Sequence, residues 1–115
     1  NVLRGFITLQ QDLPTTKKNV YENSPWMVKK YPMEELFLLP NIIKSLEGHV
    51  WSVFYRDLTK QNVELAHKHG LATCVWTVNR EKDIIRMIEY GVDGIITDYP
   101  KKVQEICKSK NISWF

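Results

Sequence analysis

Three strand-like runs recur at nearly equal intervals along the second half of the chain, and this spacing constrains the fold more than any other feature. The runs are His49–Tyr55, Ala72–Val78 and Val92–Thr97. Comparable positions within them, Val53, Val75 and Ile95, lie 22 and 20 residues apart. Helical patterns fill the intervals. Strand, helix and strand at this period form parallel strands joined by right-handed crossovers, so the sequence predicts a parallel α/β sheet.

Residues typical of helix ends predict where the three helices that follow these runs begin or end. Thr59 is a suitable N-cap for the first helix, and Gly70 follows its last turn. Asn79 is the predicted N-cap of the second helix, which ends at Gly91. Pro100 lies in the first turn of the last helix, where its missing N–H costs nothing.

The first part of the chain is less regular. A further strand is predicted over Val2–Gln10, and we expect an insertion near residues 12–48. Within it, Pro32–Leu39 has a helical pattern that Pro40 interrupts, and Asn41–Glu47 forms a second short helix. The chain therefore holds about four strand–helix units. A complete barrel of eight units needs about 250 residues, so the period is compatible with half a barrel or with a small open sheet.

Composition excludes several classes of protein. The 115 residues suit one domain, and 43% of them are hydrophobic. The net charge is only +3, and the lysines are scattered without interleaved aromatic residues, which argues against nucleic acid. The sequence contains no run of about 18 apolar residues, so no membrane-spanning helix is predicted. No glycine-rich phosphate loop follows a strand. We expect the two cysteines, Cys74 and Cys107, to be free, partly buried thiols.

Reactive groups of parallel α/β folds gather at the carboxyl ends of the strands, where this chain places Tyr55, Trp76, Asn79 and Asp98. Each has a structural alternative. Trp76 and Tyr55 are also suited to a core. Asn79 and Asp98 could act as helix caps. The neighbouring Arg56 and Asp57 are expected to form a surface pair of little energetic weight.

Three motifs resemble the glycerophosphodiester phosphodiesterase family. They are WSVFYRDLT at Trp51–Thr59, VWTVN at Val75–Asn79 and GVDGIITDYP at Gly91–Pro100. Leu3–Ile7 weakly resembles an earlier strand of the same family. The resemblance implies the C-terminal half of a TIM-type (β/α)₈ barrel. The chain starts without an initiator methionine or signal peptide, which agrees with part of a longer protein.

The resemblance also implies an activity and a cofactor. Members of this family hydrolyse glycerophosphodiesters to an alcohol and glycerol 3-phosphate, with a divalent cation, calcium or magnesium, held by carboxylates. Two histidines serve as acid and base, one of them in a His-Arg-Gly motif. This chain has neither that motif nor a Glu-x-Asp pair on a strand. We expect His49, His67 and His69 to be structural or exposed to solvent, and the metal ligands and catalytic groups to belong to a missing N-terminal half.

By the same resemblance, this half supplies a wall of the substrate pocket. Trp76, Asn79, Asp98 and Tyr55 are its candidate residues. Trp76 and Asn79 also match a tryptophan and a polar residue of the related spider-venom sphingomyelinase D family, whereas Asp98 replaces an asparagine there. The alternative is a module without catalysis or metal. Its exposed strand edges and apolar inner face would pair with a second copy or another chain, because a lone half-barrel should be unstable as a monomer.

Overall fold

The computed structural model describes residues 2–8 and 37–113, which alternate strands and helices. In chain order the elements are β1 (Gly5–Thr8), α2 (Leu39–Ser45), β2 (Val50–Phe54), α3 (Lys60–Lys68), β3 (Ala72–Trp76), α4 (Glu81–Tyr90), β4 (Gly94–Ile95) and α5 (Pro100–Ser109). Within these residues, no helix has the length and apolar character needed to cross a membrane. The expected insertion lies mostly outside the described residues, as do Gln10 and nearly all of the helix predicted over Pro32–Leu39.

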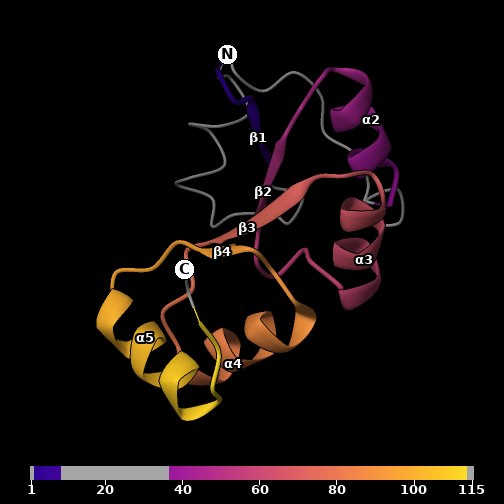
Figure 1. The fold of residues 1–115 in the computed structure, drawn as a ribbon. Coiled ribbons are helices and arrows are strands. Elements are labelled where there is room, and N and C mark those ends of the chain that lie inside the picture. The colour runs from indigo at the N-terminus through magenta and orange to yellow at the C-terminus, as the bar shows by residue number, and fades with distance from the viewer. Residues whose placement is uncertain (1, 9–36, 114–115) are drawn as a thin grey trace, which may run out of the picture.

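The four strands form one parallel sheet in the order β1-β2-β3-β4. Val53 is paired in register with Val75, and Val75 with Ile95, which confirms the alignment predicted from their spacing. The helices α2, α3, α4 and α5 follow one another in an arc along one side of the strands (Figure 1). Each strand is thus followed by a helix on the same side, which is the repeating unit of an α/β barrel.

The two faces of the sheet differ in burial. Trp51, Val53, Thr73 and Val75 have no exposed surface, and their face packs against the helices. The opposite face alternates with it and carries only half-buried or exposed side chains, among them Phe54, Cys74 and Trp76. We call this second face the open face. It corresponds to the interior of a closed barrel, since barrel helices cover the outside.

Most predicted helix ends agree with the structure. Thr59 caps α3 by accepting a hydrogen bond from Asn62 N–H, and Pro100 is the first residue of α5. Gly70 and Gly91 follow α3 and α4 with φ of 74° and 81°, the left-handed conformation that glycine adopts without strain. The two thiols are free, with Cys107 buried and Cys74 half-buried.

Two helix predictions were wrong. The N-cap of α4 is Arg80 and not Asn79, and no side chain caps this helix. Pro40 does not interrupt a helix but lies in the first turn of α2, which begins at Leu39 rather than at Asn41. Proline fits the first turn because the N–H that it lacks would have had no partner within the helix.

Candidate functional site

The carboxyl ends of β3 and β4 are joined by the side chain of Asn79. Its Nδ2 donates to Oδ2 of Asp98 at 2.7 Å, and its Oδ1 accepts from the Asp98 backbone N–H at 3.0 Å. Oδ1 also accepts from Oγ1 of Thr97 at 3.1 Å. The amide thus uses both ends to hold the loop between β4 and α5. Asp98 does not cap α5, whose N-cap is Tyr99 without a side-chain bond.

Trp76 is the last residue of β3 and lies on the open face. Its Nε1 donates to the Ser52 carbonyl oxygen at 3.2 Å, and its ring lies 5.3 Å from that of Phe54. The indole N–H is therefore satisfied by the neighbouring strand, while the half-buried ring faces the space that a barrel would enclose. The structure consequently brings Trp76, Asn79 and Asp98 to one end of the sheet.

Tyr55 is placed differently from these three residues. It is 8% exposed and belongs to the hydrophobic core, with its ring 5.2 Å from Phe54. Its hydroxyl accepts a hydrogen bond from Nε of Arg56 at 3.1 Å. The expectation that Asp57 lies at the surface was wrong, because Asp57 is 1% exposed, whereas Arg56 is exposed as expected.

Two residues at the same end were not singled out from the sequence. Thr97 Oγ1 also accepts from the Tyr99 backbone N–H at 3.1 Å, so Thr97 shapes the loop together with Asn79. Lys102 Nζ donates to the Asn79 carbonyl oxygen at 3.3 Å and lies 4.7 Å from the Tyr99 ring centroid. The position of Lys102 could have been inferred from the sequence. Pro100 starts the helix, which puts Lys102 in the first turn of α5, directly after the loop that contains Asp98.

The described residues 2–8 and 37–113 contain no group of three or more His, Cys, Asp or Glu side chains that could hold a metal ion. Asp98 is a carboxylate at the carboxyl ends of the strands, and one of its oxygens already accepts a hydrogen bond from Asn79. His49 lies before β2, at the opposite end of the sheet, where its Nδ1 accepts from the Arg4 N–H at 3.1 Å.

A match to a protein-family model identifies the family of this chain. The model of the glycerophosphoryl diester phosphodiesterase family matches residues 9–102, which is more than half of the chain. The chain belongs to this family. A glycerophosphodiester phosphodiesterase of Caldanaerobacter subterraneus is 43% identical over 56 residues, which cover 49% of this chain and 23% of that relative.

Solved structures of this family agree with the fold. A putative glycerophosphoryl diester phosphodiesterase from Silicibacter pomeroyi aligns with 99% of this chain and 33% of its own, at a TM-score of 0.73 and 30% identity. A phosphodiesterase from Oleispira antarctica, solved with the product sn-glycerol-3-phosphate, aligns with a TM-score of 0.61 over 92% of this chain and 33% of its own. At 17% identity, the second shows the fold alone. The fold is thus half of an α/β barrel, and the chain spans a quarter to a third of these proteins' lengths.

In α/β barrels the amino-terminal ends of the strands, opposite the end that carries Asn79 and Asp98, contribute to stability. Here Asp93 joins three elements. Its Oδ2 accepts from the backbone N–H and the hydroxyl of Thr73 and lies 2.7 Å from Nε2 of His67. Burial alone would raise the pKa of Asp93, but the bonds from Thr73 and His67 together outweigh it and lower that pKa. Burial and the Asp93 carboxylate raise the pKa of the Cys74 thiol.

The lowered pKa of Asp93 leads to a pH-dependent prediction. A carboxyl group whose pKa falls on folding stabilises the protein above its ordinary pKa, near 3.8, and this contribution disappears as the pH falls through the folded value. We expect Asp93→Asn to lower the unfolding free energy at pH 7 by about 0.5–1 kcal/mol, since the carboxylate is partly exposed and screened. The difference should shrink as the pH is lowered from 7 to about 2.5, because protonation of the folded carboxyl group removes its contribution.

Urea unfolding at both pH values measures this difference. Glu89→Gln, an exposed carboxylate on α4, is the matched control and should show no comparable change at pH 7. A stability gap between wild type and Asp93→Asn that is equally large at both pH values would mean that the charge of Asp93 is not what stabilises the fold.

Proposed function

We propose that this chain is part of a phosphodiesterase that hydrolyses glycerophosphodiesters to an alcohol and glycerol 3-phosphate. The observation that carries the proposal is the Asn79–Asp98 hydrogen bond of 2.7 Å at the carboxyl ends of the strands, in a member of this family. Active sites of α/β barrels lie at that end. The Oleispira antarctica phosphodiesterase, solved with sn-glycerol-3-phosphate, supports the choice of product.

In this proposal the chain forms a wall of the substrate pocket. The Trp76 ring supplies an apolar surface for the glycerol or head-group part. Asn79 and Asp98 hold each other in place and present polar atoms at the mouth. Lys102 adds a positive charge near the same loop, which favours a phosphodiester anion. Tyr55 supports the wall from the core through the Phe54 ring, which contacts both Tyr55 and Trp76.

The proposal includes a divalent cation, calcium or magnesium, in the complete enzyme. When bound, such an ion neutralises the charge of the phosphoryl oxygens. The described residues do not form a carboxylate cage for it, so its ligands, and the acid and base, are assigned to the remaining part of the barrel. Within this chain, the roles are therefore limited to binding and positioning the substrate.

The upstream coding sequence tests this proposal. We expect it to encode a His-Arg-Gly motif and paired carboxylates, and the complete protein to hydrolyse glycerophosphocholine with calcium or magnesium. The 115-residue chain alone should give no turnover. Turnover by the chain alone, or a coding sequence that starts at Asn1, would contradict the assignment of catalysis to a missing half.

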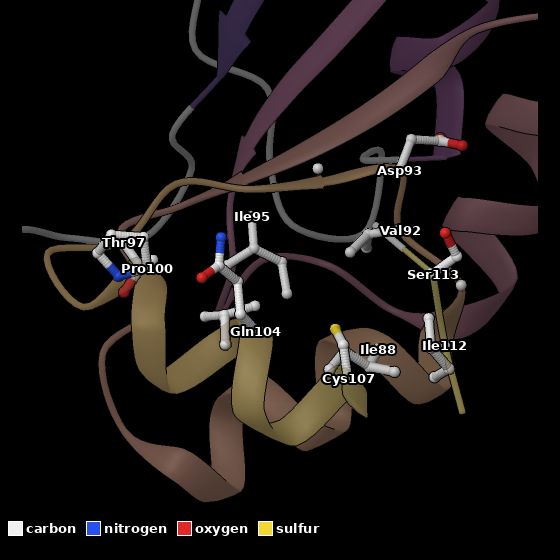
Figure 2. Close-up of a pocket in the computed structure, with 13 residues that line it drawn as sticks. Ile88, Val92, Asp93, Ile95, Thr97, Pro100, Gln104, Cys107, Ile112 and Ser113 are labelled. Carbon is white, nitrogen blue, oxygen red and sulfur yellow. The ribbon is translucent and has the colours of Figure 1, made fainter. Parts of the chain in front are cut away.

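A second candidate function is pairing with another chain or a second copy. Two uncovered surfaces favour it: the open face of the sheet with its edge, and a groove beside α5. Ile7 on the open face is 77% exposed, and Ile96 beyond β4 is 50% exposed. An apolar groove of about 440 Å³ also lies between α5 and β4 (Figure 2). Ile88, Val92 and Ile95 line it together with Cys107 of α5. In a complete barrel, further strands and helices of the same protein would cover both surfaces.

Light scattering coupled to size-exclusion chromatography distinguishes a monomer from a dimer or larger species of the isolated 115-residue chain. We expect a dimer or larger species, because exposed apolar faces and strand edges drive association. Ile7→Lys should reduce association by placing a charge on the open face, whereas Val2→Lys, at a similarly exposed residue before the strand, is the control. A wild-type chain that remains a monomer at all concentrations would contradict the pairing function.

A further inference from the structure

A second pocket, of about 510 Å³, lies between the loop that follows β2 and helix α4. Its lining consists of Tyr55, Arg56, Leu58, Arg80, Lys82, Asp83, Arg86 and Tyr90. None of the residues of the Asn79–Asp98 network is among them. The pocket shares only Tyr55, which supports the wall from the core, with the proposed substrate wall, and we call it the cationic pocket.

The charge of this pocket is strongly positive. Four cationic side chains and one carboxylate line it, which gives a formal charge of +3. The net charge of the whole chain is also +3, so the charges of all other residues sum to zero. A positive excess gathered in one concave site concentrates the electric field there and attracts anions.

Two of the four cations are held in place by the single carboxylate. Asp83 is 5% exposed, and its oxygens lie 3.0 Å from Nη2 of Arg86 and 3.9 Å from Nε of Arg80. The two guanidinium groups nevertheless keep 44% and 60% of their side-chain surface exposed. Asp83 thus fixes them along one wall without covering the N–H groups that remain free to bind an anion.

The loop that follows β2 supplies a third guanidinium. Nε of Arg56 donates to the Tyr55 hydroxyl at 3.1 Å, and its guanidinium carbon lies 5.6 Å from the Tyr55 ring centroid. Tyr55 is itself anchored in the core. Lys82 adds a flexible ammonium group from the first turn of α4. Guanidinium forks match tetrahedral oxyanions, because each fork can engage two oxygens at once.

We propose that the cationic pocket binds a phosphoryl group of a phosphomonoester, at a site distinct from the substrate wall. A dianionic phosphoryl group balances the +3 charge better than a single carboxylate does, and a pocket of this volume accepts the group with a small substituent. Glu81 lies beside Lys82 at the start of α4 but does not line the pocket. The phosphoryl group comes either from solution or from a lipid head group at a membrane surface.

Titration of the 115-residue chain with inorganic phosphate, followed by amide chemical shifts, tests the site. We expect saturable shifts at Leu58, Arg80 and Lys82. Lys82→Gln should raise the Kd about threefold, which is the effect of removing one exposed ion pair. Lys101→Gln is the matched control, since each lysine is the second residue of a ten-residue helix. The control should leave the Kd unchanged, and the dispersed spectrum of each variant verifies that it is folded.

Cosedimentation with phosphatidylcholine vesicles, with and without phosphatidic acid, separates the two sources. Binding that needs phosphatidic acid and weakens in Lys82→Gln but not in Lys101→Gln assigns a lipid head group. A response to inorganic phosphate alone assigns a soluble ligand. The proposal is overturned if neither probe binds, if the shifts map elsewhere, or if both variants weaken binding equally. Because no turnover is measured, loss of the proposed phosphodiesterase activity would leave this test unaffected.

Discussion

Gly48→Ala is expected to lower the unfolding free energy by about 3 kcal/mol, at the upper end of the cost of overpacking a core. Gly48 is buried between α2 and β2, and its N–H donates to the Ile43 carbonyl oxygen at 2.8 Å. A Cβ atom here would lie 2.7 Å from that oxygen, closer still to Cγ2 of Ile43, and 3.0 Å from Cε2 of Phe6. The backbone oxygen cannot rotate away, so the end of α2 must shift.

Two other glycines serve as matched controls for this prediction. A Cβ at Gly5 would meet nothing closer than Val50 at 3.9 Å, so Gly5→Ala should be nearly neutral. A Cβ at Gly94 would lie 2.7 Å from Sγ of Cys74, which a side-chain rotation can relieve, so Gly94→Ala should be intermediate. Urea unfolding of the three variants measures the order. If Gly48→Ala were as stable as Gly5→Ala, α2 would not be packed as described.

The part of the fold that sequence could predict is the part governed by local periodicity. Val53, Val75 and Ile95 were aligned correctly because each strand is followed by one helix and one glycine-ended turn, which keeps the repeat nearly constant. Thr59 was identified correctly because a cap needs only a backbone N–H three residues away. The repeat length and the helix cap both depend on residues that are close together in the sequence.

The parts that sequence missed depend on distant residues. Asn79 has the residue type and position of an N-cap, but its amide instead bonds Thr97 and Asp98, 18 and 19 residues away. The parallel sheet makes this possible by pairing β4 with β3. Asp57 follows a charged neighbour and was expected at the surface, yet packing around the end of β2 buries it. The cationic pocket likewise joins two separate segments, so no single motif displays it.

Asn79→Asp is expected to lower kcat/KM of the proposed complete phosphodiesterase about a hundredfold, the scale of effect when a reacting group is misplaced by roughly 1 Å. The substitution replaces the Nδ2 donor with an oxygen, facing the Asp98 carboxylate that now lies 2.7 Å away. Two carboxylates at that distance repel each other, and one of them is forced to take up a proton or move. Movement displaces the loop that carries Thr97 and Asp98, whereas a proton on one carboxyl group restores a donor between the two side chains.

Comparison with Asn41→Asp separates this local effect from the added charge, because Asn41 is exposed on α2 and should tolerate the change. The role of Asn79 is to position Asp98, so Asn79→Asp should also make kcat/KM dependent on pH, recovering part of the activity where one carboxylate is protonated. A merely structural role predicts reduced stability without that pH dependence. Activity of Asn79→Asp equal to that of Asn41→Asp would remove Asn79 and Asp98 from the proposed pocket wall.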